Sequence, residues 1–80
     1  MTRNEIIARL QPIFDDLFME KVTLTQEVRP ADVEEWDSLI HISVLLAVEK
    51  DFGVRFGLGE VEATGNVGEF ADLIAKKAGG

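Results

Sequence analysis

The strongest constraint on the fold is an apolar segment of helical length, Ile40 to Phe52, which directly follows the run Glu35-Trp36-Asp37-Ser38-Leu39. Aspartate is a preferred N-cap residue, so Asp37 is expected to cap a helix that runs from about Ser38 to Phe52. Gly53 is expected to end this helix, because glycine readily adopts the left-handed conformation common at helix C-termini. The hydroxyl group of Ser38 would then be exposed at a helix N-terminus, where free N–H groups and the helix dipole favour negative charge such as a phosphate ester.

This central helix carries two apolar stripes. One is typical of a core-facing surface and contains Val44, Leu45, Val48 and Phe52. The other lies beside Ser38 and Glu49 and contains Leu39, Ile42 and Leu46. A surface helix needs only one apolar stripe, so the second indicates either deeper burial or a docking face. Ile42 and Leu46 are therefore expected either to belong to the core or to be partly buried and contact a partner.

A first helix is predicted from near Thr2 to about Phe18. Thr2 and Glu5 fit a capping box, in which each residue accepts the backbone N–H of the other. Apolar residues then recur at helical spacing: Ile6, Ile7, Leu10, Ile13, Phe14, Leu17 and Phe18. Pro12 removes one helical hydrogen bond, and because the periodicity persists beyond it, a kinked helix is preferred to two separate pieces.

The last helix is predicted to begin after Asn66, an N-cap residue with Glu69 three positions later. Its apolar stripe consists of Val67, Phe70, Leu73, Ile74 and Ala78, and Lys76 and Lys77 suit its C-terminus. A short additional helix is expected from Gly59 to Ala63, although the neighbouring glycines make it poor by propensity.

Met19 to Glu35 is expected to be a long connection between the first and central helices, with Leu24, Val28 and Val33 fixing it to the core. Pro30 and the acidic residues after it indicate turns. The predicted fold class is all-α: a small bundle of three main helices plus one short helix, with a long loop between the first and second helices. Residues 1–80 are expected to form a single domain.

The charge of the chain narrows its possible partners. The net charge is −7, and residues 31 to 65 contain eight acidic side chains but only two basic ones. Such a field repels nucleic acid and anionic membranes and steers the protein toward basic protein surfaces. Composition alone favours a purely solvated acidic surface, but the clustering of the acidic residues around one exposed serine favours steering toward a partner. There is no cysteine, and no apolar run approaches the roughly 18 residues of a membrane span. The N-terminus lacks the apolar region of a signal peptide, so a cytoplasmic monomer is expected.

Evidence for catalysis is weak. His41 lies three residues after Ser38, so a Ser–His nucleophile pair is conceivable. However, His41 falls within the core-facing stripe, and neither an orienting third group nor an oxyanion loop is visible, which favours a structural histidine. The acidic run from Asp32 fails the calcium-loop pattern, because Asp37 and Ser43 occupy the positions that need glycine and glutamate. No metal site is predicted.

Trp36 is the only tryptophan. It could contact a partner, but a Trp before an N-cap more often packs onto the helix that follows. The preferred interpretation is a hydrophobic staple against Ile40 or Val44.

Taken together, these segments resemble the acyl carrier proteins, over nearly the whole chain. Asp37-Ser38-Leu39 is similar to the family's attachment motif, and Ala47-Val48-Glu49-Lys50-Asp51-Phe52-Gly53-Val54 is similar to the end of its second helix. Asn66-Val67-Gly68-Glu69-Phe70 resembles the start of its last helix. The W-D-S-L form looks more like stand-alone carriers of specialised pathways, because Ile40, His41 and Ser43 stand where fatty-acid carriers usually have acidic residues.

The resemblance implies that the chain is not an enzyme and that Ser38 carries 4′-phosphopantetheine, with Asp37 and Leu39 beside the attachment point. The arm's thiol would carry acyl intermediates of fatty acid, polyketide or related biosynthesis as thioesters. The implied partners are a phosphopantetheinyl transferase and acyl-loading and acyl-processing enzymes with basic docking surfaces. The expected docking residues are Trp36, Leu39, Ile42, Leu46 and Glu49. A peptidyl or aminoacyl carrier, an unmodified acidic helical adaptor and a small Ser–His hydrolase are the alternatives.

Overall fold

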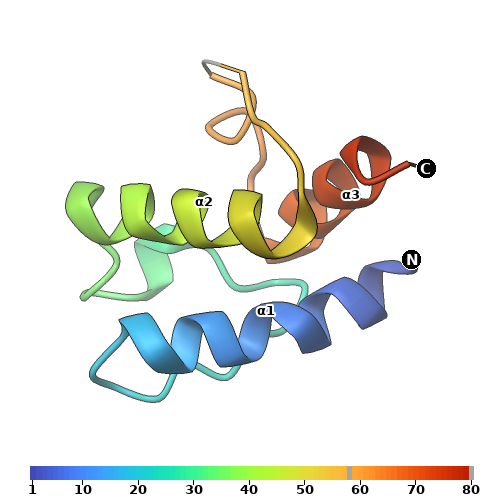
Figure 1. Ribbon diagram of the computed structural model, residues 1–80. Coiled ribbons are helices and arrows are strands. Elements are labelled where there is room, and N and C mark those ends of the chain that lie inside the picture. Colours follow the sequence, from blue (N-terminus) through green and yellow to red (C-terminus); the bar gives the residue numbers. More distant parts are fainter. Residues whose placement is uncertain (58, 80) are drawn as a thin grey trace.

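Three α-helices make up most of the computed structural model, which describes residues 1–57 and 59–79 (Figure 1). They are α1 (Arg3–Leu17), α2 (Ser38–Phe52) and α3 (Val67–Lys77), and a single 3₁₀ turn, η1 (Pro30–Asp32), lies between α1 and α2. The described residues contain no strand. The prediction of an all-α fold with three main helices and a long first loop is therefore confirmed.

The helix boundaries follow local capping signals. Thr2 and Glu5 form the predicted capping box, because each side chain accepts the backbone N–H of the other residue. The Asn66 side chain accepts the Glu69 N–H at 2.8 Å. Gly53 ends α2 with a φ of 67°, a left-handed conformation that glycine adopts without the steric penalty of a Cβ atom. These predictions are confirmed, and α1 continues through Pro12 as one helix.

The core is built around α1, which packs against both α2 and α3. The fully buried side chains of the core are Ile6, Leu10 and Phe14 from α1, Val44 and Val48 from α2, and Val67, Ala71 and Ile74 from α3. Arg9 of α1 lies over the ring of Phe52 and forms an ion pair with Asp51, both at the end of α2. In Figure 1 the beginning of α1 and the end of α3 accordingly lie on one side of the molecule, and α2 begins on the opposite side.

The loop between α1 and α2 is fixed to the core by apolar side chains and by one amide. Val22 and Leu24 are buried, and Val28 and Val33 are half-buried, which confirms the predicted contacts of Leu24, Val28 and Val33. The Gln11 side chain donates to the Val22 carbonyl oxygen at 2.8 Å and accepts the Leu24 N–H at 2.9 Å. A side chain of α1 therefore satisfies backbone groups that would otherwise need a strand partner.

Two short elements differ from the prediction. Residues 59–63 form turns instead of the expected short helix: the Ala63 N–H reaches the Gly59 carbonyl oxygen, but this single helical hydrogen bond does not propagate. Gly59 has a φ of 83°, and glycine disfavours continuation of a helix. Conversely, the turn expected at Pro30 is a 3₁₀ helix, with the Asp32 carboxylate accepting the Arg29 N–H at 3.1 Å.

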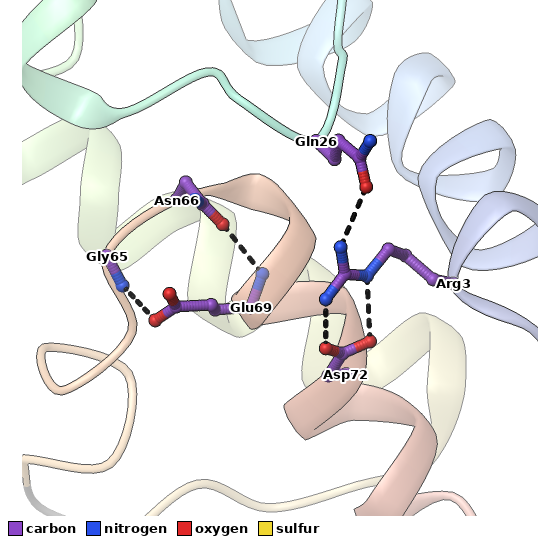
Figure 2. Close-up of polar contacts among 6 residues, drawn as sticks. All are labelled: Arg3, Gln26, Gly65, Asn66, Glu69 and Asp72. Carbon is purple, nitrogen blue, oxygen red and sulfur yellow. Dashed lines mark hydrogen bonds and ion pairs between the residues drawn. The ribbon is translucent and has the colours of Figure 1, made fainter.

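The N-terminal half of α3 is held against the long loop and against α1, and Figure 2 shows the contacts that Arg3 makes with Asp72 and Gln26. The N–H groups of Val67 and Gly68 donate to the carbonyl oxygens of Val28 and Gln26 at 2.8 and 3.0 Å. Arg3 donates to the Gln26 side chain at 2.7 Å and also binds both carboxylate oxygens of Asp72. These hydrogen bonds from the Arg3 guanidinium group hold the pKa of Asp72 below its ordinary value of 3.8.

Replacement of Gly68 tests this close approach. A Cβ atom at position 68 would lie 2.9 Å from the Gln26 Cβ and 3.1 Å from the Gln26 carbonyl oxygen. We expect Gly68→Ala to lower the free energy of unfolding by about 1–2 kcal/mol, because this clash outweighs the roughly 1 kcal/mol gained in helix propensity. Urea unfolding followed by circular dichroism measures the change. Gly65→Ala is the matched control, since its Cβ would only touch the Glu69 side chain at 3.5 Å; equal stabilities for the two variants would contradict the prediction.

Candidate functional site

Ser38 is the first residue of α2, and its side chain is exposed. Asp37 caps the helix, and its carboxylate accepts the Ile40 N–H at 2.9 Å. Both placements confirm the prediction. The first N–H groups of a helix have no acceptor within the helix, and the dipole adds partial positive charge there. A hydroxyl group at this position is accessible to a transferring enzyme, and a phosphate attached to it would meet a favourable field.

The two apolar stripes of α2 have different surroundings. Val44 and Val48 are fully buried, while Leu45 and Phe52 are half-buried. The other stripe is open: the exposed fractions of Leu39, Ile42 and Leu46 are 77%, 54% and 61%. We call these three residues the exposed α2 stripe. Their exposure excludes the core alternative for Ile42 and Leu46, and their contact with a partner stays a prediction.

The other two expected docking residues are partly engaged within the fold. Glu49 is half-buried, and its carboxylate accepts the Phe56 N–H at 2.9 Å. It therefore fixes the linker that follows α2 as well as adding charge next to Leu46. Trp36 is also half-buried, so only part of its indole ring faces solvent.

The ring of Trp36 packs against α1. It makes edge-on contacts with Phe14 and Phe18 at centroid distances of 5.0 and 5.9 Å, and these two phenylalanine rings stack on each other. The preferred partners in the sequence interpretation were Ile40 and Val44 of α2. The aromatic contacts on α1 were missed because they join segments about twenty residues apart, which no local pattern links.

His41 is held by two hydrogen bonds. The indole N–H of Trp36 donates to its Nδ1 at 3.2 Å, and its Nε2 lies 3.1 Å from a carboxylate oxygen of Glu62. Because Nδ1 accepts a hydrogen bond, the ring proton is assigned to Nε2, which donates to Glu62. The sequence interpretation found no third group beside His41, and that expectation is wrong, since Glu62 is this group.

These contacts nevertheless argue against a nucleophile pair. A catalytic histidine must use one ring nitrogen to accept the serine proton while the other is oriented by a third group. Here Trp36 occupies one nitrogen and Glu62 occupies the other, so neither is available to Ser38. The geometry fits the structural histidine that the sequence favoured.

A groove of about 630 Å³ opens next to Ser38. This volume lies within the roughly 300–1,000 Å³ range of small-molecule sites. Its apolar walls consist of Pro30, Trp36, Ile42, Val44, Leu45, Val61, Val67 and Phe70, and its polar lining consists of Asp37, Ser38, His41, Glu62, Thr64 and Asn66. The groove is bounded by α2 on one side and by residues 61–67 on the other. An apolar chain attached at Ser38 would therefore find apolar surface close to its attachment point.

The described residues carry neither a cluster of metal ligands nor a membrane-spanning helix. Within residues 1–57 and 59–79, no three His, Asp or Glu side chains come close enough together to hold a metal ion. None of the described helices combines the length and the apolar character that a membrane span requires.

Comparison with known proteins identifies the family. No family model matches the chain. It is 28% identical over 79 residues to an acyl carrier protein of Thermotoga maritima, and this match covers 98% of both chains. The solution NMR structure of a holo acyl carrier protein from Geobacter metallireducens is 37% identical and superposes with a TM-score of 0.82, covering 90% of this chain and 84% of that one.

The chain belongs to the acyl carrier protein family.

In this member of the acyl carrier protein family, the site residues close to Ser38 in the sequence could be predicted from local patterns. The residues of the opposite wall of the groove could not. Val61, Glu62, Thr64 and Asn66 line the groove together with Ser38, although they lie more than twenty residues away from it. Only Asn66 carried a sequence signal, and that signal concerned the start of α3. The pairing of His41 with Glu62 has no local pattern that would reveal it.

The cap that positions Ser38 can be tested by stability. We expect Asp37→Ala to lower the free energy of unfolding by about 0.5–2 kcal/mol, because the Ile40 N–H loses its acceptor. Asp37→Asn keeps an oxygen at the same position and should retain most of the stability. Urea unfolding of both variants provides the measurement, and a variant with alanine as stable as the one with asparagine would refute the capping role.

Proposed function

We propose that the protein is a discrete acyl carrier whose Ser38 bears 4′-phosphopantetheine and which has no catalytic activity of its own. The observation that carries this proposal is the exposed serine at the capped N-terminus of α2, in a chain that belongs to the acyl carrier protein family. The solved relative from Geobacter metallireducens is described as a holo protein, which supports the presence of a prosthetic group here.

The residues around Ser38 fit such a group. Asp37 already satisfies the Ile40 N–H, and the N–H groups before it at the start of α2 have no acceptor within the helix, so they could bind the phosphate of such a group. The group would supply a terminal thiol that holds acyl cargo as a thioester, which is chemistry that the chain cannot supply itself because it contains no cysteine. The apolar lining of the adjacent groove offers shelter for an acyl chain.

Partner enzymes would dock on the exposed α2 stripe. Leu39, Ile42 and Leu46 follow Ser38 along one face of the helix, and Glu49 and the exposed edge of Trp36 extend this surface. The net charge of −7 supports partners with basic docking surfaces, namely a phosphopantetheinyl transferase and the acyl-loading and acyl-processing enzymes of fatty acid, polyketide or related specialised biosynthesis. The carrier would work as a cytoplasmic monomer, without nucleic-acid or membrane partners.

The alternatives differ in how well the geometry supports them. A peptidyl or aminoacyl carrier would use the same serine and differ only in cargo. An unmodified acidic adaptor would use the same docking surface without the groove or the serine. The hydrolase lacks support, because both ring nitrogens of His41 are occupied by Trp36 and Glu62.

Enzymatic loading decides between a carrier and an adaptor. The protein is incubated with coenzyme A and a broad-specificity phosphopantetheinyl transferase, and its intact mass is recorded. We expect the parent to gain the mass of one phosphopantetheine and Ser38→Ala to gain none. Ser43→Ala is the matched control, because Ser43 is an exposed serine on the same helix and the only other serine of the chain; it should be modified like the parent. An unmodified parent, under conditions that load a known carrier, would favour the adaptor.

The docking role of the exposed α2 stripe can be measured with the same transferase. We expect Ile42→Ala and Leu46→Ala each to lower kcat/KM for modification by about tenfold, because truncating a central apolar contact typically costs 1–2 kcal/mol of binding. Circular dichroism should show unchanged folding, since both side chains are more than half exposed. Met19→Ala is the control, because Met19 is a 96% exposed apolar residue outside the stripe. Values of kcat/KM equal to that control would exclude this surface as the docking site.

A further inference from the structure

One wall of the groove is held in place by two carboxylates, each bound to a different helix. Residues 59–65 rise away from the three helices in Figure 1. Glu60 binds Lys77 of α3 at 2.8 Å and also accepts the Gly57 N–H. Glu62 accepts the hydrogen bond from His41 of α2 at 3.1 Å. The His41–Glu62 pair therefore joins α2 to residues 61–67, the two walls of the groove that Ser38 also lines.

The orientation of the His41 ring is fixed by Trp36 on the side away from Glu62. The indole N–H of Trp36 donates to Nδ1 of His41, and the Trp36 ring packs edge-on against Phe14 of α1 and Phe18 at its C-cap. The imidazole ring consequently presents Nε2–H to Glu62. Only 24% of the His41 side chain is exposed, against 60% for Glu62. Glu62 can turn toward water, whereas His41 cannot easily find another acceptor.

The other polar groups of the groove are used within their own segments. Asp37 caps Ile40, Asn66 caps Glu69, and the Thr64 hydroxyl donates to the Val61 carbonyl oxygen. Apart from Ser38 itself, the His41–Glu62 pair is thus the polar feature that joins the two walls. The same groove is lined by the buried apolar side chains of Val44, Val61, Val67 and Phe70. A cargo chain from Ser38 that enters the groove therefore shares it with this polar pair.

We propose that His41 and Glu62 make the groove selective for acyl cargo that carries a hydroxyl group. The inference rests on the proposed function, since it assumes a cargo attached through Ser38. A hydroxyl group both accepts and donates, so it can insert between the Nε2–H of His41 and the carboxylate of Glu62 and satisfy both. An unsubstituted alkyl chain that enters between them would separate the pair and leave the His41 N–H without a partner, which is costly for a side chain that is only 24% exposed.

Other polar cargo fits this pair less well. A terminal carboxylate accepts from His41 but is repelled by Glu62, and no lysine or arginine lines the groove within the described residues to offset that repulsion. An ammonium group donates to Glu62 but has no lone pair for the His41 N–H. The hydroxyl group is the simplest substituent that satisfies both partners. His41 and Glu62 would therefore act as specificity-determining residues for the cargo.

The experiment compares cargo inside and outside the groove by NMR. The protein is loaded with octanoyl-phosphopantetheine or with hydroxyoctanoyl chains that carry the hydroxyl group near the thioester, at mid-chain or near the end. The amide signals of Val61, Thr64 and Phe70 report occupation of the groove. For at least one hydroxylated chain, we expect the ratio of molecules with cargo inside the groove to molecules with cargo outside it to be about tenfold higher than for octanoyl. Equal occupation by octanoyl and all three hydroxylated chains would overturn the proposal.

Variants separate selection by the polar pair from simple loosening of the wall. Glu62→Ala should reduce the tenfold preference for the hydroxylated chain over octanoyl to near equality, because His41 then has no carboxylate partner for an alkyl chain to displace. Glu60→Ala releases the same segment from α3 but keeps the pair, so its preference should match the parent. If Glu60→Ala instead abolishes the preference as Glu62→Ala does, mobility of the wall explains the effect and the proposal fails. In a second variant, His41→Phe, the groove should hold octanoyl in preference to the hydroxylated chains, because the phenyl ring offers no hydrogen-bond donor for a hydroxyl group.

Loading itself is checked by intact mass before each spectrum. If Ser38 accepts no phosphopantetheine, the proposed function fails and this inference falls with it. If Ser38 is loaded and the occupations are equal, the carrier function stands and the hydroxyl selectivity alone is refuted.

Discussion

The packing of Trp36 on α1 holds the N-terminus of α2 in place relative to α1. The residue stands immediately before the Asp37 cap, and its ring makes edge-on contacts with Phe14 and Phe18, which stack on each other. This contact joins the end of the long loop to the central helix of the core. Without it, the capping of α2 by Asp37 would still be favourable locally, but the N-terminus of α2 would not be fixed relative to α1. The orientation of Ser38, the hydrogen bond to His41 and the near wall of the groove all depend on this aromatic cluster.

The acidic residues around the site have two physical roles at once. Glu35 accepts the N–H groups of Met19 and Glu20, Asp37 accepts that of Ile40, and Glu49 accepts that of Phe56. Each of these carboxylates is an anchor for the backbone. The role of Asp37 was expected from the sequence, whereas those of Glu35 and Glu49 were not. Because a backbone N–H carries no net charge, the anchoring leaves the carboxylate's own charge uncompensated. The same side chains can therefore hold loops in place and maintain a negative field over the N-terminal part of α2.

What could be predicted from the sequence was governed by interactions between residues a few positions apart. The caps formed by Thr2, Asp37 and Asn66 involve partners three residues away, and the apolar periodicities of the helices are equally local. The exposure of Ser38 followed from its place beside a cap. Those parts of the fold and site were accessible because helix geometry alone relates the residues concerned.

The parts of the fold and site that could not be predicted depend on contacts between residues far apart in the sequence. His41 meets Glu62 across 21 positions, and the Trp36 ring meets α1, because turns that have no periodic pattern bring them together. The segment 59–63 was expected to be helical on the strength of a few weak positions, yet Gly59 with its positive φ favours turns. The far wall of the groove is built from this segment, so its residues could not be assigned to the site from sequence.

The arrangement of the ends of the chain has a practical consequence. The beginning of α1 and the end of α3 lie on one side of the molecule, and α2 begins on the other (Figure 1). The bidentate bond between Arg3 and Asp72 ties the start of α1 to α3 on that same side. An affinity tag, a fluorescent fusion or a bead linked to either terminus would therefore be held remote from Ser38, so immobilised protein should present its serine outward to any enzyme in solution.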